Sequence, residues 1–239
     1  MPDLDENLTL AELVTAEPAL AGLLDRLGLD YCCGGQRPLV EAVDAAGLDL
    51  GEVLQSLAMV DAQSTVENWS SMGPGELVDH IESTHHAYLR TELPRLTALA
   101  HKVASVHGTR YPELADIQSL FLQLRADLEP HLLKEERILF PMIRQLDSAE
   151  SVPNFHCGSL VSPIRMMLSE HDTAGDLLAD LRAATGGYVV PDDGCASYQS
   201  LFTGLAELEA DIHLHVHKEN NLLFPSVMAA ESALTGSRS

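Results

Sequence analysis

Apolar side chains recur at helical spacing along the chain, first in short clusters and later in long stripes. In residues 1–60 the clusters are brief and are separated by glycine and proline, which indicates a small unit of short helices. Thr9 followed by Glu12 has the spacing of a capping box, so a helix is expected to begin there. A second is expected from Pro18 to Gly28, and two further short helices after it.

The longer part of the chain carries four successive blocks with an apolar period close to 3.6. Before these blocks, residues 61–75 are rich in serine and glycine, a composition typical of a linker. We therefore predict an all-α protein with a small helical domain in residues 1–60 and a linker in 61–75. After the linker we predict a four-helix bundle in residues 76–230 and a flexible tail in residues 231–239.

One eleven-residue segment occurs twice in the bundle region. His131–Pro141 reads HLLKEERILFP and His215–Pro225 reads HVHKENNLLFP, 84 positions later, with six of eleven positions identical. Each copy contains His-x-x-x-Glu, and positions i and i+4 of a helix lie on one face. His86 and His171 precede the two copies by 45 and 44 residues, so four helices can each supply a histidine.

Turn positions give the expected heights of these histidines. His86 and His131 lie at similar distances from the turn at 107–112, so they are expected at one level of an antiparallel hairpin. His171 and His215 lie at unequal distances from the turn at 186–191, a mismatch that a long loop or a displaced fourth helix could absorb. A proline at position 130 removes a backbone hydrogen bond, so a kink is expected beside His131.

The repeated histidines and glutamates extend the apolar stripes of their helices, so they are expected to point into the bundle. A single buried histidine is more often a hydrogen-bonded core residue than a ligand. Two buried carboxylates are costly without compensation, and a bound cation supplies it. The predicted ligands are His86, His131, Glu135, His171, His215 and Glu219.

Ligand number and type indicate which metal this set would hold. Six ligands exceed the four of a zinc site, and the set contains no cysteine. Imidazole with carboxylate suits iron or manganese, and Glu135 and Glu219 could bridge two ions with two histidines completing each. A solvent-derived oxo or hydroxo group would bridge the two ions. Each ion would keep one open coordination position, at which dioxygen, peroxide or nitric oxide could bind.

Net charge and other bulk properties exclude several classes of partner. Asp and Glu number 36 against 14 Lys and Arg, a formal charge of −22, which disfavours nucleic acid and anionic membranes. The acidic start is no export signal, and no apolar run approaches the length of a membrane span. Four cysteines, two of them adjacent, are too few for a disulfide framework, so a reducing cytoplasm is expected.

With both FP tails, the histidine and glutamate set resembles the hemerythrin-like cation-binding domain. Joined to an N-terminal unit that contains DYCCGG at residues 30–35, the whole chain is similar to the Ric (repair of iron centres) di-iron proteins of bacteria. The resemblance implies an up-down four-helix bundle holding two irons. It also implies that His86, and not the adjacent His85, is the ligand, because His86 matches the motif position ahead of Leu93 and Pro94.

The resemblance also implies a function, the repair of iron-sulfur clusters damaged by nitric oxide or oxidative stress. Damaged iron-sulfur proteins would then be the partners, and a homodimer is left open. Three hypotheses remain from the sequence: a repair factor that supplies iron, an oxidoreductase that reduces nitric oxide or peroxide, and a carrier or sensor of dioxygen or nitric oxide. Whether the chain is an enzyme stays open, with the iron donor favoured.

Several other polar residues have a chemical and a plainer interpretation. His80, Asp127 and Glu170 could contact the ligands from outside, although solvated carboxylates are the plainer interpretation of the two acids. His217 lies two residues from His215 and is expected at the surface. The lysines that repeat in the two copies, Lys134 and Lys218, are also expected on the outer face.

The cysteines divide into a pair and two single residues. Gly34 and Gly35 could allow positive φ and a close backbone approach, so that N–H groups near Cys32 and Cys33 would favour the thiolate. Such thiols could take up iron, sulfur or nitric oxide, or reduce the metal site. The alternative is two small buried residues in a tight turn. Cys157 and Cys195 have no partner at metal spacing and stay unassigned.

Overall fold

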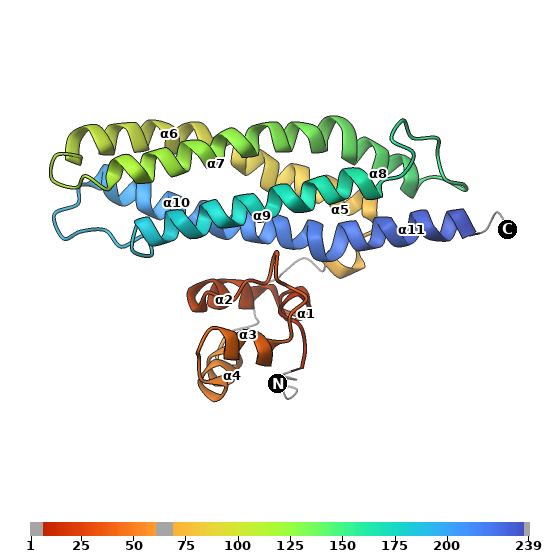
Figure 1. The fold of residues 1–239 in the computed structure, drawn as a ribbon, viewed down its shortest axis with the longest axis horizontal. Helices are drawn as coiled ribbons and strands as arrows, with labels where there is room; N and C mark the ends of the chain where they lie inside the picture. The colour runs from red at the N-terminus through yellow and green to blue at the C-terminus, as the bar shows by residue number, and fades with distance from the viewer. Residues whose placement is uncertain (1–6, 61–68, 237–239) are drawn as a thin grey trace.

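The computed structural model describes residues 7–60 and 69–236. Within these ranges the secondary structure is helical and contains no strand, apart from one isolated bridge between Thr9 and Pro38. The all-α prediction is therefore confirmed. The long helices lie side by side in a bundle, and the short N-terminal helices form a separate unit beside its middle, with α1 and α2 nearest to it (Figure 1).

The small unit has the short helices that its apolar clusters predict. The capping box is present, because Thr9 Oγ1 accepts from the Glu12 amide at 3.1 Å and Glu12 accepts from the Thr9 amide at 2.8 Å. Pro18 opens a short 3-10 turn and not an α-helix, and α2 ends at Gly28, whose φ is 68°. The helices are α1 (Leu10–Ala16), α2 (Ala21–Leu27), α3 (Leu39–Ala45) and α4 (Leu50–Ala58).

The bundle consists of four long rods, and a π-helical turn interrupts three of them. The first rod is α5 (Pro74–Ile81), η3 (Glu82–His86) and α6 (Ala87–His107). The second is α7 (Leu114–Lys134), η4 (Glu135–Leu139) and α8 (Phe140–Asp147). The third is α9 (Val161–Ala184), and the fourth is α10 (Ala196–His217), η5 (Lys218–Leu223) and α11 (Phe224–Gly236).

The π turns of the second and fourth rods each come directly before a Phe-Pro pair. Pro141 and Pro225 offer no backbone N–H, and a proline ring crowds the carbonyl four residues before it. In the widened turns the amide of Phe140 bonds to the carbonyl of Glu135, and that of Phe224 to Glu219. By contrast α7 continues through Pro130, and the departure from α geometry begins at Glu135 in the second rod and at Lys218 in the fourth.

Two apolar clusters fill the interior, one on each side of the predicted ligands. The larger joins the small unit to the half of the bundle built from α6, α7, α10 and the end of α9. The smaller joins α5, α8, the start of α9 and the segment from Leu223 to Val227. The predicted ligands lie between the two clusters along every rod, so they form a polar layer within an otherwise apolar core.

Packing between the rods accounts for the uneven second hairpin. α9 packs mainly against α7, and α10 mainly against α6, while α9 and α10 make little contact. Residues 185–195 connect α9 to α10 without regular helix. This long connection lets His171 and His215 reach one level although they lie at different distances from the turn.

The structure differs from the expected boundaries at both ends of the bundle. Residues 61–68 of the expected linker lie outside the described residues, but Trp69 is buried and α5 already begins at Pro74. At the other end α11 continues to Gly236, so the expected flexible tail is helical as far as that residue. Glu231 holds it, accepting hydrogen bonds from Ser159 Oγ and the Leu160 amide at 2.8 and 3.1 Å. No described helix is both long and apolar enough to cross a membrane.

Candidate metal centre

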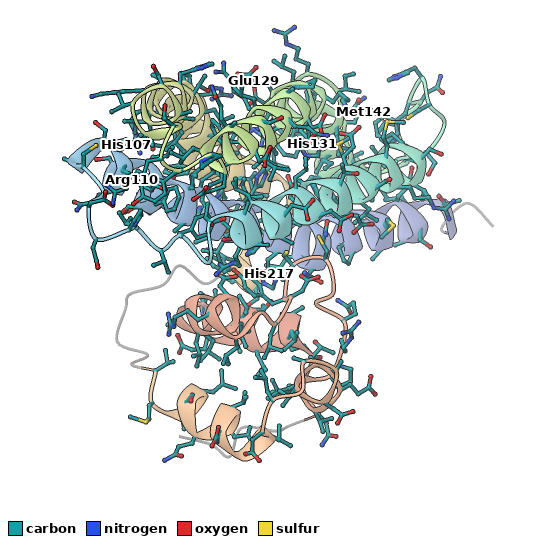
Figure 2. All side chains as sticks on the ribbon, turned by 60° about the vertical axis from the view of Figure 1, so that its left-hand side comes forward. His107, Arg110, Glu129, His131, Met142 and His217 are labelled. Carbon is teal, nitrogen blue, oxygen red and sulfur yellow. The ribbon has the colours of Figure 1, made fainter. Side chains whose placement is uncertain are left out.

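The six predicted ligands meet between the four rods, in two overlapping groups. One group is His86, Glu135, His215 and Glu219, and the other is His131, Glu135, His171 and Glu219. Within each group the ligand atoms lie within 4.8 Å of one another. His131 is visible among the rods of the bundle in Figure 2. The two glutamates belong to both groups, one from each copy of the repeat.

The carboxylates are oriented so that each presents one oxygen to each group. Glu135 Oε2 lies 3.4 Å from Nε2 of His86, and its Oε1 lies 3.2 Å from Nε2 of His131. Glu219 Oε1 lies 3.3 Å from Nε2 of His215, and its Oε2 lies 3.1 Å from Nε2 of His171. This is the arrangement that two bridging carboxylates require.

Burial without hydrogen bonds shows that this polar layer fits a cation. Glu135 and Glu219 are fully buried, and none of their four oxygens accepts a hydrogen bond from the described residues. The Nε2 atoms also face each other in pairs, at 3.3 Å for His86 with His215 and 3.1 Å for His131 with His171. Buried carboxylates are costly when unpaired, so converging lone pairs of this kind suit positive charge between them.

The pKa values of the buried groups follow from burial and from one another. Burial raises the pKa of Glu135 and Glu219, but the neighbouring imidazoles outweigh it and hold both below their usual range. Burial is the largest single influence on the pKa of His131 and lowers it, but Glu135, Glu219 and Glu170 together raise this pKa, to about 9. Burial keeps the pKa of His215 below its ordinary value. Carboxylates that stay ionised are ready to bind metal.

Three of the four imidazoles are held by a hydrogen bond at Nδ1. Nδ1 of His86 lies 2.8 Å from Glu136, and Nδ1 of His131 lies 2.8 Å from Glu170. Nδ1 of His171 lies 2.7 Å from the amide oxygen of Asn220. Since a carboxylate only accepts, Nδ1 of His86 and of His131 must donate, so in the neutral ring that binds a metal the Nε2 lone pair is the free one.

The other predicted neighbours of the ligands lie in different places. Glu170 contacts His131 and also pairs with Lys134. Asp127 is exposed and contributes to the wall of a cavity of about 230 Å³, which is also lined by His131 and His171. His80 instead contacts Lys218, one residue before Glu219, with 2.8 Å between Nε2 and Nζ.

A second buried cluster lies beside His215, and the sequence did not predict it. Lys218 was expected at the surface, but it is 2% exposed, with Nζ 2.7 Å from Nε2 of His85 and 4.1 Å above the ring of Trp69. His85 stacks on His215, at 5.3 Å between ring centroids, and its Nδ1 lies 2.8 Å from Asp211. Burial lowers the pKa of His85 to about 3. Neither metal group includes His85.

Contacts between the bundle and the small unit overturn the surface interpretation of His217. This histidine is fully buried, with Nε2 3.2 Å from Thr15 Oγ1 and Nδ1 3.3 Å from the Tyr31 carbonyl. Figure 2 shows it where the bundle meets the small unit. Nearby, Nδ1 of His213 lies 2.7 Å from Asp25. The face of α10 that turns away from the metal groups is therefore covered, which the helical period alone does not reveal.

The turn with the paired cysteines differs from its predicted electrostatics. The amides of Cys32, Cys33 and Gly34 donate to the Asp30 carboxylate at 3.0, 2.9 and 2.8 Å, so they are not available to a thiolate. The pKa of the Cys32 thiol is raised, most by its hydrogen bond with Cys33 and next by burial. The prediction of a favoured thiolate is therefore wrong for Cys32. Asp30, Cys32 and Cys33 form a third group whose ligand atoms lie within 4.8 Å.

The glycines of this turn serve close packing and not positive φ. Neither is among the described residues with positive φ. A Cβ on Gly34 would lie 2.9 Å from the Asp30 carboxylate, and one on Gly35 would lie 2.4 Å from the Tyr31 carbonyl and 3.1 Å from Asn221 Nδ2. Glycine is therefore required where the turn presses against the bundle.

The two single cysteines are exposed and lie away from the metal groups. Cys157 is in the connection between α8 and α9. Cys195 precedes α10, and its Sγ lies 3.2 Å from Nε2 of His107. A hydrogen bond from the Tyr198 amide and a second one with His107 lower the pKa of the Cys195 thiol to about 7.

Known families match both parts of the chain. The hemerythrin HHE cation binding domain matches residues 77–227, and a domain of unknown function (DUF542) matches residues 6–61. The chain is 34% identical over 222 residues to the iron-sulfur cluster repair protein YtfE of Enterobacter sp. (strain 638), covering 93% of this chain and 97% of that protein. The protein of the same name from Escherichia coli O157:H7 is also 34% identical over 93% and 97% of the two chains. A probable iron-sulfur cluster repair protein of Haemophilus influenzae is 35% identical, over 92% and 96%.

Proposed function

The chain belongs to the hemerythrin HHE family of iron-sulfur cluster repair proteins, and on this premise we propose that it supplies iron to damaged iron-sulfur clusters. The relatives named as iron-sulfur cluster repair proteins align along nearly the whole of the chain, the small domain included. The partners would then be iron-sulfur proteins whose clusters have been damaged by nitric oxide or oxidation.

The six converging residues would hold two iron ions. Each ion would have two histidines of its own and share Glu135 and Glu219 with the other, so that four protein groups surround it. Iron held by so few protein ligands keeps open positions, at which dioxygen, peroxide or nitric oxide can bind. The assignment is supported most by the carboxylates, which turn one oxygen toward each group and accept no hydrogen bond from the described residues.

The surrounding residues hold the ligands and control access to them. Glu136, Glu170 and Asn220 fix the imidazole rings at Nδ1. The two apolar clusters keep water from the layer along the axis of the bundle, whereas the cavity of about 230 Å³ at His131 and His171 offers a lateral path. An iron ion that is donated to a damaged cluster must leave the protein, and this lateral path would let it do so.

Cluster repair can be tested by transfer of iron to a defined recipient. The protein, loaded with two ferrous ions, is incubated with a cluster-free hydratase and a sulfide source, and recovery of hydratase activity is measured. We expect faster recovery than with the same concentration of free ferrous iron. Glu219→Ala, which should not retain the ions, is the matched control and should behave like free iron. Equal recovery with the loaded protein and with free iron would reject the proposal.

Reduction of nitric oxide or peroxide at the same centre is a second candidate. The cavity lined by His131 and His171 favours it, because a small molecule can reach the metal groups through it. This function requires steady production of nitrous oxide, or loss of peroxide, over many turnovers with a reductant. A single turnover per centre would instead indicate binding without catalysis.

A further inference from the structure

The two copies of the repeat differ at the residues that follow the shared glutamates. The first copy has Glu136 and Arg137, and the second has Asn220 and Asn221. Glu136 accepts from Nδ1 of His86 and pairs with Arg90, so its contacts stay within the bundle. Asn220 instead contacts two regions of the chain, the metal group through His171 and the small domain through Cys32.

The contacts of Asn220 fix the direction of its side-chain amide. A backbone carbonyl only accepts, so the group that faces the carbonyl of Cys32 at 3.3 Å must be the amide nitrogen. The amide oxygen then faces His171, at 2.7 Å from Nδ1, and must accept a proton from it. His171 is thereby held with its hydrogen on Nδ1 and its Nε2 lone pair toward Glu219. Without the carbonyl, the amide could turn over and favour the opposite tautomer, whose Nε2–H cannot bind a metal.

Asn221 holds the same turn from the next position. Its Nδ2 lies 3.0 Å from the carbonyl of Cys32 and 3.3 Å from that of Tyr31, and its Oδ1 accepts from Gln36 at 3.0 Å. Gly35 lets the turn come this close. Two asparagines of the second copy therefore donate hydrogen bonds to backbone carbonyls of the turn at residues 30–35. One of them, Asn220, also accepts a hydrogen bond from the predicted ligand His171.

We propose that Asn220 is a positioning residue that makes metal retention by the His131 and His171 group depend on docking of the turn at residues 30–35. The inference rests on the proposed function, since it takes the two groups as metal positions. The cavity of about 230 Å³ is lined by His131, Glu170 and His171, and by His215 of the other group. Undocking of the turn would thus weaken retention of the ion at His131 and His171, which can leave the bundle through this cavity.

Coupling between two sites is reciprocal, so metal binding must also stabilise the docked turn. A neutral hydrogen bond contributes about 1 kcal/mol, which corresponds to about a threefold to tenfold change in an equilibrium. Because Asn220 and Asn221 contact backbone carbonyls, this coupling does not need the thiols. A chain with all four cysteines replaced by serine therefore tests it without metal binding to sulfur.

The test uses cobalt(II) in the full-length cysteine-free chain. Hydrogen–deuterium exchange of residues 30–37 is measured with and without cobalt, and loss of the two ions to a chelator is followed in the visible spectrum. We expect cobalt to slow exchange of this segment about threefold to tenfold. Asn220→Ala should speed the loss of one ion by a similar factor and leave the other within about twofold.

Two further variants separate coupling from a general loss of structure. Asn220→Asp still accepts from His171 but cannot donate to the carbonyl of residue 32, so it should keep both ions while exchange of residues 30–37 no longer responds to cobalt. Glu136→Gln, the matched change in the first copy, should affect the other ion and leave the turn unchanged. The inference would be overturned if cobalt did not change the exchange rate of residues 30–37 in the parent chain. It would also be overturned if cobalt still slowed this exchange in Asn220→Asp. Failure of the parent chain to bind two ions would instead reject the proposed function.

Discussion

The two copies of the repeated segment have the same ligands and very different surroundings. Each supplies a histidine, a glutamate and a π turn before a Phe-Pro pair. Around the first copy the partners are charged and partly exposed, with Lys134 37% exposed beside Glu170. Around the second, Lys218 and His217 are buried beneath Trp69 and the small domain. The repeated histidine and glutamate thus contribute to both candidate metal groups, whereas what packs against each copy differs.

The comparison also shows that the same residue can have opposite roles in the two copies. Lys134 and Lys218 occupy equivalent positions, yet only Lys218 is enclosed by His80 and His85. His80 and His85 come from α5 and η3 of the first rod, and Trp69, which also covers Lys218, comes from η2 (Trp69–Ser71) before it. A local duplication therefore gave two similar helices, and contacts from distant segments made them unequal.

The largest expected effect tests the feature that the copies share. Glu135→Ala and Glu219→Ala each remove a carboxylate from both groups, so each should weaken binding of both ions by more than about 100-fold. Metal analysis after gel filtration checks this. His101→Ala, on the exposed side of α6, is the control and should keep two ions per chain. Two retained ions in either glutamate variant would disprove the shared-ligand assignment.

The two lysines test the difference in burial. Lys218→Ala removes a cation from above Trp69 and leaves Nε2 of His80 and of His85 without that partner, so it should reduce the free energy of unfolding by about 2–4 kcal/mol. Lys134→Ala removes a partly exposed pair and should cost under about 1 kcal/mol. Urea unfolding of the metal-free proteins measures both. Equal losses would show that enclosure of Lys218 does not contribute to stability.

Exchanging the differing residues tests whether they determine docking. Asn220→Glu with Asn221→Arg gives the second copy the residues of the first at these two positions and removes the side-chain amides that donate to Tyr31 and Cys32. The Cys32 thiol, 5% exposed in the docked turn, should then react with a maleimide at least about tenfold faster.

The matched control makes the opposite exchange. In Glu136→Asn with Arg137→Asn the reactivity of Cys32 should be unchanged. Both measurements use a chain in which Cys33, Cys157 and Cys195 are serine. Equal reactivity in the two double variants would show that the asparagines do not hold the turn.

The smallest expected effect concerns the starts of the two helices that carry the copies. α7 follows Glu113 and α10 follows Cys195, and they differ in that the pKa of the Cys195 thiol is lowered to about 7 by the Tyr198 amide and by His107. A lowered pKa means that thiolate is present above pH 7, so alkylation of Cys195 should rise with pH to half its maximum near 7. His107→Ala should move this midpoint upward. A midpoint near the ordinary value of about 8.5 in the parent protein would contradict the assignment.

The convergence of the candidate ligands could be predicted because the spacing within each copy is fixed by helical geometry. The four-residue spacing within each copy places His131 with Glu135 and His215 with Glu219 on one face, and the apolar stripes show that this face is inward. Long elements with a clear period were likewise correct in type and differed at their ends, as where α11 continues to Gly236, and in the π turns that interrupt three of the rods.

What the sequence did not predict depends on contacts between distant segments. A helical period shows which residues share a face but not how many faces are covered, so Lys218 and His217 were expected at the surface. Leu214 and Val216, which widen the apolar arc of α10, were the one signal of a second covered face. The role of Asn220 required the docked position of Cys32, 188 residues away. Likewise, the sequence did not show that the Asp30 carboxylate accepts hydrogen bonds from the turn amides that were expected to favour a Cys32 thiolate.

The π turns have a consequence for how the protein tolerates insertion and deletion. Each widened turn accommodates one residue more than an α-helix would over the same rise, between the shared glutamate and the phenylalanine that enters the smaller apolar cluster. Removing one residue between Glu135 and Phe140 would therefore let the turn relax to α-helix, with Phe140 and Ile143 still facing that cluster. Removing one residue from the regular α-helix before Glu135 would instead rotate everything downstream by about 100°. The widened turns are thus the places where the far end of the molecule can stay aligned with the polar layer after the loss of a residue.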